Sequence, residues 1–208
     1  MMGIKQLQHC YGLVLLWAVL AISMIKPPYP ELLYLQHIPT VAALLCWPYI
    51  QRRLAFSFAA SAGLAVFMLL HILGTRYIYS YVPYDEWMQA LAGVTLTGSF
   101  ALRRNHYDRV VHFAFGLLFA RLAFEIFRYR LKLSDRLSRY LAADFILAAS
   151  ALYELFEWLL TLVLAGSDAD AYNGQQGDAW DAHKDMALAF IGSICALCCI
   201  RRQPSTEC

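Results

Sequence analysis

The chain has 208 residues, of which 60% are hydrophobic and only 15% are charged. Soluble domains are usually about half apolar and about a quarter charged, so this composition indicates an integral membrane protein. The formal net charge of +2 comes without a basic run interleaved with aromatic residues, which excludes the nucleic-acid-binding class. We therefore expect a single all-α membrane domain over residues 1–208, with bilayer lipid as its partner and no nucleic-acid partner.

The hydrophobic segments predict a polytopic transmembrane helical bundle. A helix of about 20 residues crosses the hydrocarbon layer, so the chain has room for six or seven spans with short connections. The apolar run from Tyr11 to Ile25 lacks a small-residue cleavage site, so we expect it to be retained as the first span. The predicted spans are residues 12–25, 32–50, 54–74, 86–102, 108–127, 141–165 and 180–200.

Ionisable residues recur at helical spacing in the last three predicted spans. Residues three or four apart lie on one face of a helix. If there are seven spans, the fifth begins, the sixth ends and the seventh begins on the same side of the membrane. We therefore expect an acidic pocket there, formed by Asp108 and His112 of the fifth span, Glu154 and Glu157 of the sixth, and Asp178, Asp181 and Asp185 of the seventh.

Several of these residues also have a purely structural interpretation. Asp108, Asp178 and Asp181 could cap helix N-termini by accepting hydrogen bonds from free backbone N–H groups. A lone histidine on an apolar face, such as His112, is often a satisfied core residue. Glu154 and Glu157 are different, because a carboxylate inside the bilayer costs roughly 2.5–3.5 kcal/mol and neither residue lies at a helix end. The two glutamates therefore predict a functional site.

The chemistry of this set suits a divalent cation: zinc, magnesium, manganese or calcium. We expect His112 and Asp185 to be the main ligands, with Asp181 and Asp178 as further metal ligands nearer the surface. Glu157 is expected to be a ligand or a catalytic base, with Glu154 supporting it and Asp108 also in the catalytic set. Without a metal, a glutamate beside His112 could act as a general base or a proton relay.

A second polar set is expected toward the opposite surface. It comprises His37, His71, and the pair Arg121 and Glu125, whose spacing of four residues predicts a mutual ion pair.

Three blocks of the chain form distinctive motifs. The blocks are Arg-Asn-His-Tyr-Asp-Arg-Val-Val-His-Phe at 104–113, Ser-Ala-Leu-Tyr-Glu-Leu-Phe-Glu-Trp at 150–158, and Gln-Gly-Asp-Ala-Trp-Asp at 176–181 followed by Asp185 and Met186. Together they resemble the motifs of a known family, the bacterial YjdF-type membrane proteins. The segment from Tyr77 to Pro83 also fits, and the resemblance covers residues 70–195. The family is a domain of unknown function with a distant likeness to VanZ-like envelope proteins. The resemblance implies a multi-spanning protein of the bacterial inner membrane.

Three functions are compatible with these features. The first is a metal-dependent envelope enzyme that acts on a lipid or lipid-linked substrate. The second is a proton-coupled transporter or channel that uses Glu154 and Glu157, with His37, His71 and Glu125 continuing the path from the other side. The third is a structural or accessory membrane protein. The distribution of lysine and arginine among the seven-span connections predicts that the acidic site faces the extracytoplasmic side.

Overall fold

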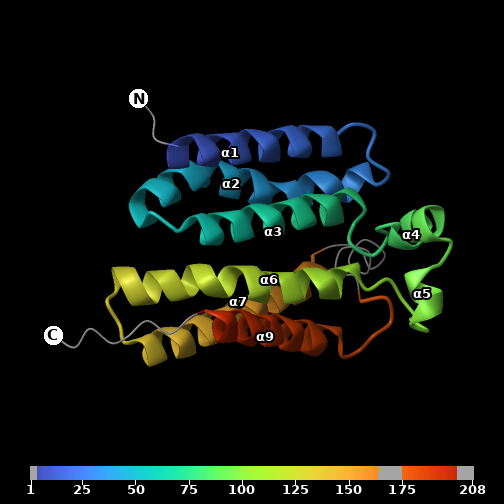
Figure 1. The fold of residues 1–208 in the computed structure, drawn as a ribbon. Helices are drawn as coiled ribbons and strands as arrows, with labels where there is room; N and C mark the ends of the chain where they lie inside the picture. The colour runs from blue at the N-terminus through green and yellow to red at the C-terminus, as the bar shows by residue number, and fades with distance from the viewer. Residues whose placement is uncertain (1–3, 164–174, 201–208) are drawn as a thin grey trace.

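The structure is a computed structural model that describes residues 4–163 and 175–200. Helices dominate these residues, and no strand occurs among them. Six helices are long, and they lie alongside one another as a bundle (Figure 1). They are α1 (Ile4–Ser23), α2 (Pro30–Leu54), α3 (Phe58–Arg76), α6 (Tyr107–Glu125), α7 (Asp135–Thr161) and α9 (Asp181–Cys199).

The polytopic transmembrane bundle predicted from the sequence is confirmed. Three described helices are long and apolar enough to cross a bilayer by length and composition: α3, α6 with its extension to Arg130, and α9. The other long helices match predicted spans, although α7 begins at Asp135 rather than at residue 141. Local signals explain where helices begin. The hydroxyl groups of Ser57 and Ser134 accept N–H bonds from Ala60 and Leu137 and so cap α3 and α7.

The long helices form two groups of three. α1 and α2 both pack on α3, around a core that includes Leu16, Leu44 and Ile72. α6, α7 and α9 pack on one another around a second core that includes Phe124 and Ile146. Contact between α3 and α6 joins the two groups (Figure 1). The candidate site therefore depends on how the second group is packed.

The predicted span 86–102 is wrong. This segment forms two short helices, α4 (Tyr84–Ala92) and α5 (Leu96–Ser99), which have no buried residues. Gly93 ends α4 in the left-handed conformation (φ +70°), which glycine adopts without steric cost. Asp85 then holds the pair together, because its Oδ1 accepts the Thr97 N–H at 3.0 Å and its Oδ2 accepts the Thr97 hydroxyl. Neither helix is long enough to cross a bilayer.

The loss of this span changes which groups share a side of the membrane. The end of α3 and the start of α6 lie at the same end of the bundle, the end near α4 and α5 (Figure 1). We call this the site end. His37 and His71 belong to the site end, since His37 lies early in α2 and His71 late in α3. Their predicted position near the opposite surface was wrong, whereas the Arg121–Glu125 ion pair is confirmed at 3.1 Å.

Helices α6 and α9 approach each other unusually closely. A β-carbon at Gly116 of α6 would lie 1.8 Å from the Ala189 carbonyl oxygen, and one at Gly192 of α9 would lie 2.2 Å from the Phe113 carbonyl oxygen. Both distances are shorter than any tolerable contact, so the helix backbones meet only because both residues lack side chains. Small residues at such crossings are the usual basis of close helix packing in membranes.

We predict that Gly116→Ala and Gly192→Ala each destabilise the protein by about 3 kcal/mol, because α6 and α9 must separate to admit a methyl group. The measurement is denaturant-induced unfolding in detergent micelles. Gly12→Ala is the matched control, since no atom lies within 4 Å of a β-carbon at that helical position. It should leave stability unchanged or raise it by up to about 1 kcal/mol. Equal effects at all three glycines would contradict this account of the packing.

Candidate functional site

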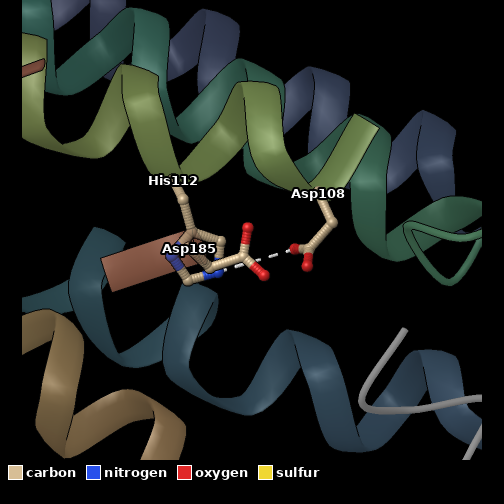
Figure 2. A group of neighbouring side chains, drawn as sticks. All are labelled: Asp108, His112 and Asp185. Atoms are coloured by element: carbon tan, nitrogen blue, oxygen red, sulfur yellow. Dashed lines mark ion pairs between the residues drawn. The ribbon is translucent and has the colours of Figure 1, made fainter. Parts of the chain in front are cut away.

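Asp108 and His112 project from the first two turns of α6. Their spacing of four residues puts them on one face, and the Nε2 atom of His112 lies 3.7 Å from Oδ1 of Asp108. Both residues are buried, at 9% and 8% exposure. Figure 2 shows the two side chains extending from α6 toward Asp185.

Asp185 comes from the first turns of α9 and completes a buried group of three. One oxygen of Asp108, one nitrogen of His112 and one oxygen of Asp185 all lie within 4.8 Å of one another. Asp185 is only 2% exposed, and its Oδ1 atom is buried without a hydrogen-bond partner. Because Asp185 lies about two turns before Gly192 on the same helix, the close α6–α9 crossing keeps it near α6.

The two glutamates of α7 lie on the third side of this group. Oε1 of Glu154 is 3.6 Å from Nε2 of His112, and it too is buried without a hydrogen-bond partner. Glu157 is buried at 9% exposure, one turn further along α7 and outside the group of three. The sequence analysis expected Glu157 beside the histidine and Glu154 behind it. The structure has the reverse order, with Glu154 in the nearer position.

Asp178 and Asp181 lie apart from this group and are occupied by basic side chains. Arg104 donates to Oδ1 of Asp181 at 2.5 Å, and Arg109 reaches the same atom at 3.1 Å. Arg109 also donates to Asp178 at 2.5 Å, and Lys184 does so at 2.6 Å. The carboxylates of Asp178 and Asp181 are therefore already paired with positively charged side chains of the protein. The metal-ligand role expected for Asp178 and Asp181 stays a prediction without support from these contacts.

The two arginines belong to a larger set of contacts that fixes the start of α9 to the start of α6. The side chain of Gln176 accepts the Asn105 N–H at 3.0 Å and donates to the Asn105 carbonyl at 3.1 Å. Arg104 also donates to the Gln175 carbonyl at 2.8 Å. We call these contacts the arginine latch, together with the ion pairs of Arg104 and Arg109 with Asp181 and of Arg109 and Lys184 with Asp178. Sequence analysis missed it, although Arg104, Asn105 and Arg109 all belong to the first motif block.

Asp178 is the more exposed of the two carboxylates in the latch, with 18% of its side chain exposed against 4% for Asp181. Hydrogen bonds from Lys184, from the Trp180 N–H and from Arg109 lower the pKa of its carboxyl group below the usual range. A lowered pKa in the folded state means that the charged carboxylate stabilises the fold. This stabilisation by the Asp178 carboxylate is fully present at pH values above the ordinary carboxyl pKa of about 3.9. It is lost as the pH falls through the lowered pKa of the folded protein.

A cavity of about 390 Å³ adjoins Asp108 and His112. Residues of α2, α3, α6 and α7 line it, and most of them are apolar, among them Phe67, Met68 and Phe115. Its polar lining also includes His71 and Tyr79, which sequence analysis did not assign to the site. Their place in the site could not be predicted, because the expected span 86–102 put the end of α3 and the start of α6 on opposite sides of the membrane. His71 and His112 share a cavity only if α3 ends on the side where α6 begins.

Tyr79 is held in the cavity wall by a constrained turn. Its backbone is in the left-handed region (φ +50°), as is that of Ile78 (φ +49°). The Tyr79 ring packs against Gly74, where a β-carbon would lie 2.7 Å from the ring. Its hydroxyl shares a hydrogen bond with Nδ1 of His71. Non-glycine residues in this conformation persist only when their surroundings fix them, and they concentrate at functional sites.

The group of three fits a divalent cation in chemistry and in spacing. Two carboxylates and one imidazole are the ligand types that zinc and manganese accept, and magnesium and calcium also bind the carboxylates. Ligand atoms about 2.1 Å from a tetrahedral metal lie about 3.4 Å apart. In the group of three, Nε2 of His112 lies 3.7 Å from Oδ1 of Asp108, and all three ligand atoms lie within 4.8 Å of one another. The unpartnered Oδ1 atom of Asp185 is the atom in this group that such an ion would satisfy.

We predict that Arg104→Met destabilises the protein by about 3 kcal/mol, because it leaves the buried Asp181 carboxylate with one cation fewer. Lys184→Met removes a more exposed partner of Asp178 and should change stability by less than about 0.5 kcal/mol. Denaturant titration in detergent measures both. If the two variants behaved alike, the latch would not be holding the start of α9.

Comparison with known proteins agrees with the motif resemblance. Residues 8–205 match the family described as "Predicted membrane protein (DUF2238)", a match longer than the 70–195 stretch that carries the resemblance. The chain is similar to the inner membrane protein YjdF of Escherichia coli strain K12, with 35% identity over 127 residues. This alignment covers 61% of the chain and 56% of the relative, so the chain spans little more than half the length of that protein. No solved structure matches the chain. The chain belongs to the DUF2238 family of membrane proteins.

Proposed function

We propose that the protein is a metal-dependent membrane enzyme whose divalent cation is bound by Asp108, His112 and Asp185. The observation that carries this proposal is the buried convergence of their three ligand atoms within 4.8 Å, beside an apolar cavity. The proposed substrate is a lipid or a lipid-linked molecule that enters the cavity from the bilayer.

Charge balance supports a cation. Asp108, Asp185 and Glu154 surround His112, and the arginines of the latch are engaged with Asp178 and Asp181 instead. Three carboxylates at membrane depth are costly unless a cation or protons neutralise them. A bound divalent ion would neutralise two negative charges, and the unpartnered Asp185 oxygen would coordinate it.

The proposed roles follow from position. A divalent ion supplies Lewis-acid chemistry and lowers the pKa of a water molecule that it binds. His112 must be neutral to offer Nε2 as a ligand. Glu154 is the carboxylate nearest to His112, so we assign it the role of general base, with Glu157 supporting it from the next turn of α7.

The proton-coupled transporter has less support. It needs polar groups that continue from the acidic site through the other half of the bundle. His37 and His71 were to supply that path, and both lie at the site end. Near the opposite end, Glu125 is engaged by Arg121 and by both the N–H and the hydroxyl of Ser57. This carboxylate has three partners and is suited to holding α3 against α6.

We further propose that the protein lies in the bacterial inner membrane with the site end on the extracytoplasmic side. The connection between α6 and α7 is strongly basic, with Arg128, Arg130 and Lys132 in it and Arg136 in the first turn of α7. Such connections prefer the cytoplasm. In the six-helix arrangement this connection lies at the end opposite the site.

Orientation can be tested by cysteine labelling in cells, after the six native cysteines are replaced by alanine. A thiol reagent that cannot cross the inner membrane should label Glu86→Cys on α4 in intact spheroplasts. Lys132→Cys should react only after the membrane is permeabilised. The reverse pattern would place the acidic site on the cytoplasmic side.

Metal analysis tests the proposed function directly. Protein purified in detergent and equilibrated with zinc, manganese or magnesium should retain about one ion per chain. His112→Ala and Asp185→Asn should lose at least about tenfold in metal affinity, because each removes a ligand. Asp144→Asn is the control, since this carboxylate of α7 is exposed and lies outside the group of three.

A chelator provides a second readout without an activity assay. It should lower the melting temperature of the wild type and of Asp144→Asn, because an ion that binds only the folded protein stabilises it. It should not affect His112→Ala. Wild-type protein that retains none of the three metals, and whose melting temperature is insensitive to the chelator, would overturn the proposal.

A further inference from the structure

Two buried hydroxyl groups in the cavity wall have no hydrogen-bond partner among the residues that the structure describes. Thr40 of α2 is 1% exposed and Ser150 of α7 is 2% exposed, and Oγ1 of the one and Oγ of the other are both unsatisfied. Both residues line the cavity that contains Asp108 and His112. Leaving a buried hydroxyl group unpaired is costly, so each such group calls for a partner.

Other buried hydroxyl groups in this protein are satisfied by the backbone of their own helix. Ser23, Thr75 and Ser193 each donate to the carbonyl three residues earlier in their helix, at 2.7, 2.9 and 2.7 Å. Thr40 and Ser150 do not, although they too lie inside helices. The cavity wall therefore contains two hydroxyl groups, on α2 and α7, whose oxygen atoms no described residue engages.

The rest of the lining limits what that molecule can be. Among the described residues that line the cavity there is no lysine or arginine, and Asp108 contributes a carboxylate, so these walls do not favour an anionic head group. Phe67, Met68, Val111 and Phe115 provide an apolar wall. His71 and Tyr79 add one more hydrogen-bonding pair. These surroundings suit an uncharged head that bears hydroxyl groups and is attached to an apolar chain.

The cavity also has an outlet to the side. Pro39 of α2 and Tyr153 of α7 both line it and are exposed. Along their described lengths α2 and α7 hardly contact each other, because they belong to different groups of three. A volume of about 390 Å³ is too small for a whole membrane lipid. A lipid chain can therefore leave between these two helices while its head remains inside.

We propose that the substrate class is a neutral lipid alcohol whose head is hydrogen-bonded by Thr40 and Ser150. This inference rests on the proposed function, since it places the head beside the Asp108–His112–Asp185 group. It adds the chemical class of the substrate and the two side chains that select it.

The test uses the full-length protein in phosphatidylcholine nanodiscs and a medium-chain monoacylglycerol as the probe. Bound probe is counted by native mass spectrometry and by the shift in melting temperature. The matched ligands are the diacetate of the same molecule, which lacks free hydroxyl groups, and the lysophosphatidic acid with the same chain. The monoacylglycerol should bind best.

Thr40→Val and Ser150→Ala should each weaken binding of the monoacylglycerol about fivefold, the effect of losing one net hydrogen bond. The ligand-free proteins should be as stable as the wild type or slightly more so, because each change removes an unpaired buried hydroxyl group. Ser138→Ala is the matched control. Its Oγ atom is also buried and unpartnered, but it lies near the start of α7 and outside the cavity lining, so this change should leave binding unaltered.

Three outcomes of the binding experiment overturn the inference. Equal binding of the diacetate would show that hydroxyl groups are not recognised, and tighter binding of lysophosphatidic acid would indicate a phosphate site. Destabilised variants with unchanged binding would make the two hydroxyls structural. Metal content, measured on the same samples, separates the two proposals. Hydroxyl-dependent binding without any metal would refute the enzyme alone, and metal retention without binding would refute the lipid alcohol alone.

Discussion

The close contact between α6 and α9 is the constraint on which the candidate site depends. Gly116 and Gly192 let the two backbones touch, and this contact keeps the first turns of α9 beside the first turns of α6. Asp185 can then reach the residues that α6 presents one helical turn apart. A side chain at either glycine would move the third member of the group away from the other two. The site is thus fixed by backbone packing inside the bilayer.

The acidic residues at the site end divide into two classes by depth. Those nearest the surface, Asp178 and Asp181, are neutralised by Arg104, Arg109 and Lys184. Those about a turn deeper, including Asp185 and Glu154, have no basic residue apart from His112 within ion-pair distance in the part of the chain that the structure describes. The first class anchors a loop, and the second retains unsatisfied oxygen atoms. This difference in partners distinguishes structural acids from acids that are available for chemistry.

Much of this arrangement was predictable from the sequence, because it rests on local periodicity. Hydrophobic length predicted the long helices, and offsets of three and four residues correctly put Asp108 with His112 on one face. The expectation that α6, α7 and α9 bring acids to the same end was also correct. These features depend on neighbours along the chain, so composition and spacing are sufficient to reveal them.

Other features depend on contacts that spacing does not encode. The segment 86–102 has the length and apolar content of a short span, and only the left-handed break at Gly93 shows that it stays outside the bundle. Because of this extra predicted span, His37 and His71 were expected on the membrane side opposite the site. The part of the cavity lined by α2 and α3 was therefore not predicted. The pairing of Arg104 with Asp181 crosses 77 positions of sequence, and nothing local to either residue specifies it.

The division of the bundle into two groups of three has a further consequence. α3 and α6 provide the main contact between the groups, and the exposed α4–α5 segment is their covalent link. A break in the polypeptide near Gly93 would separate two fragments that each keep a complete three-helix core. Such fragments, produced as separate chains in one membrane, should find each other through the α3–α6 surface.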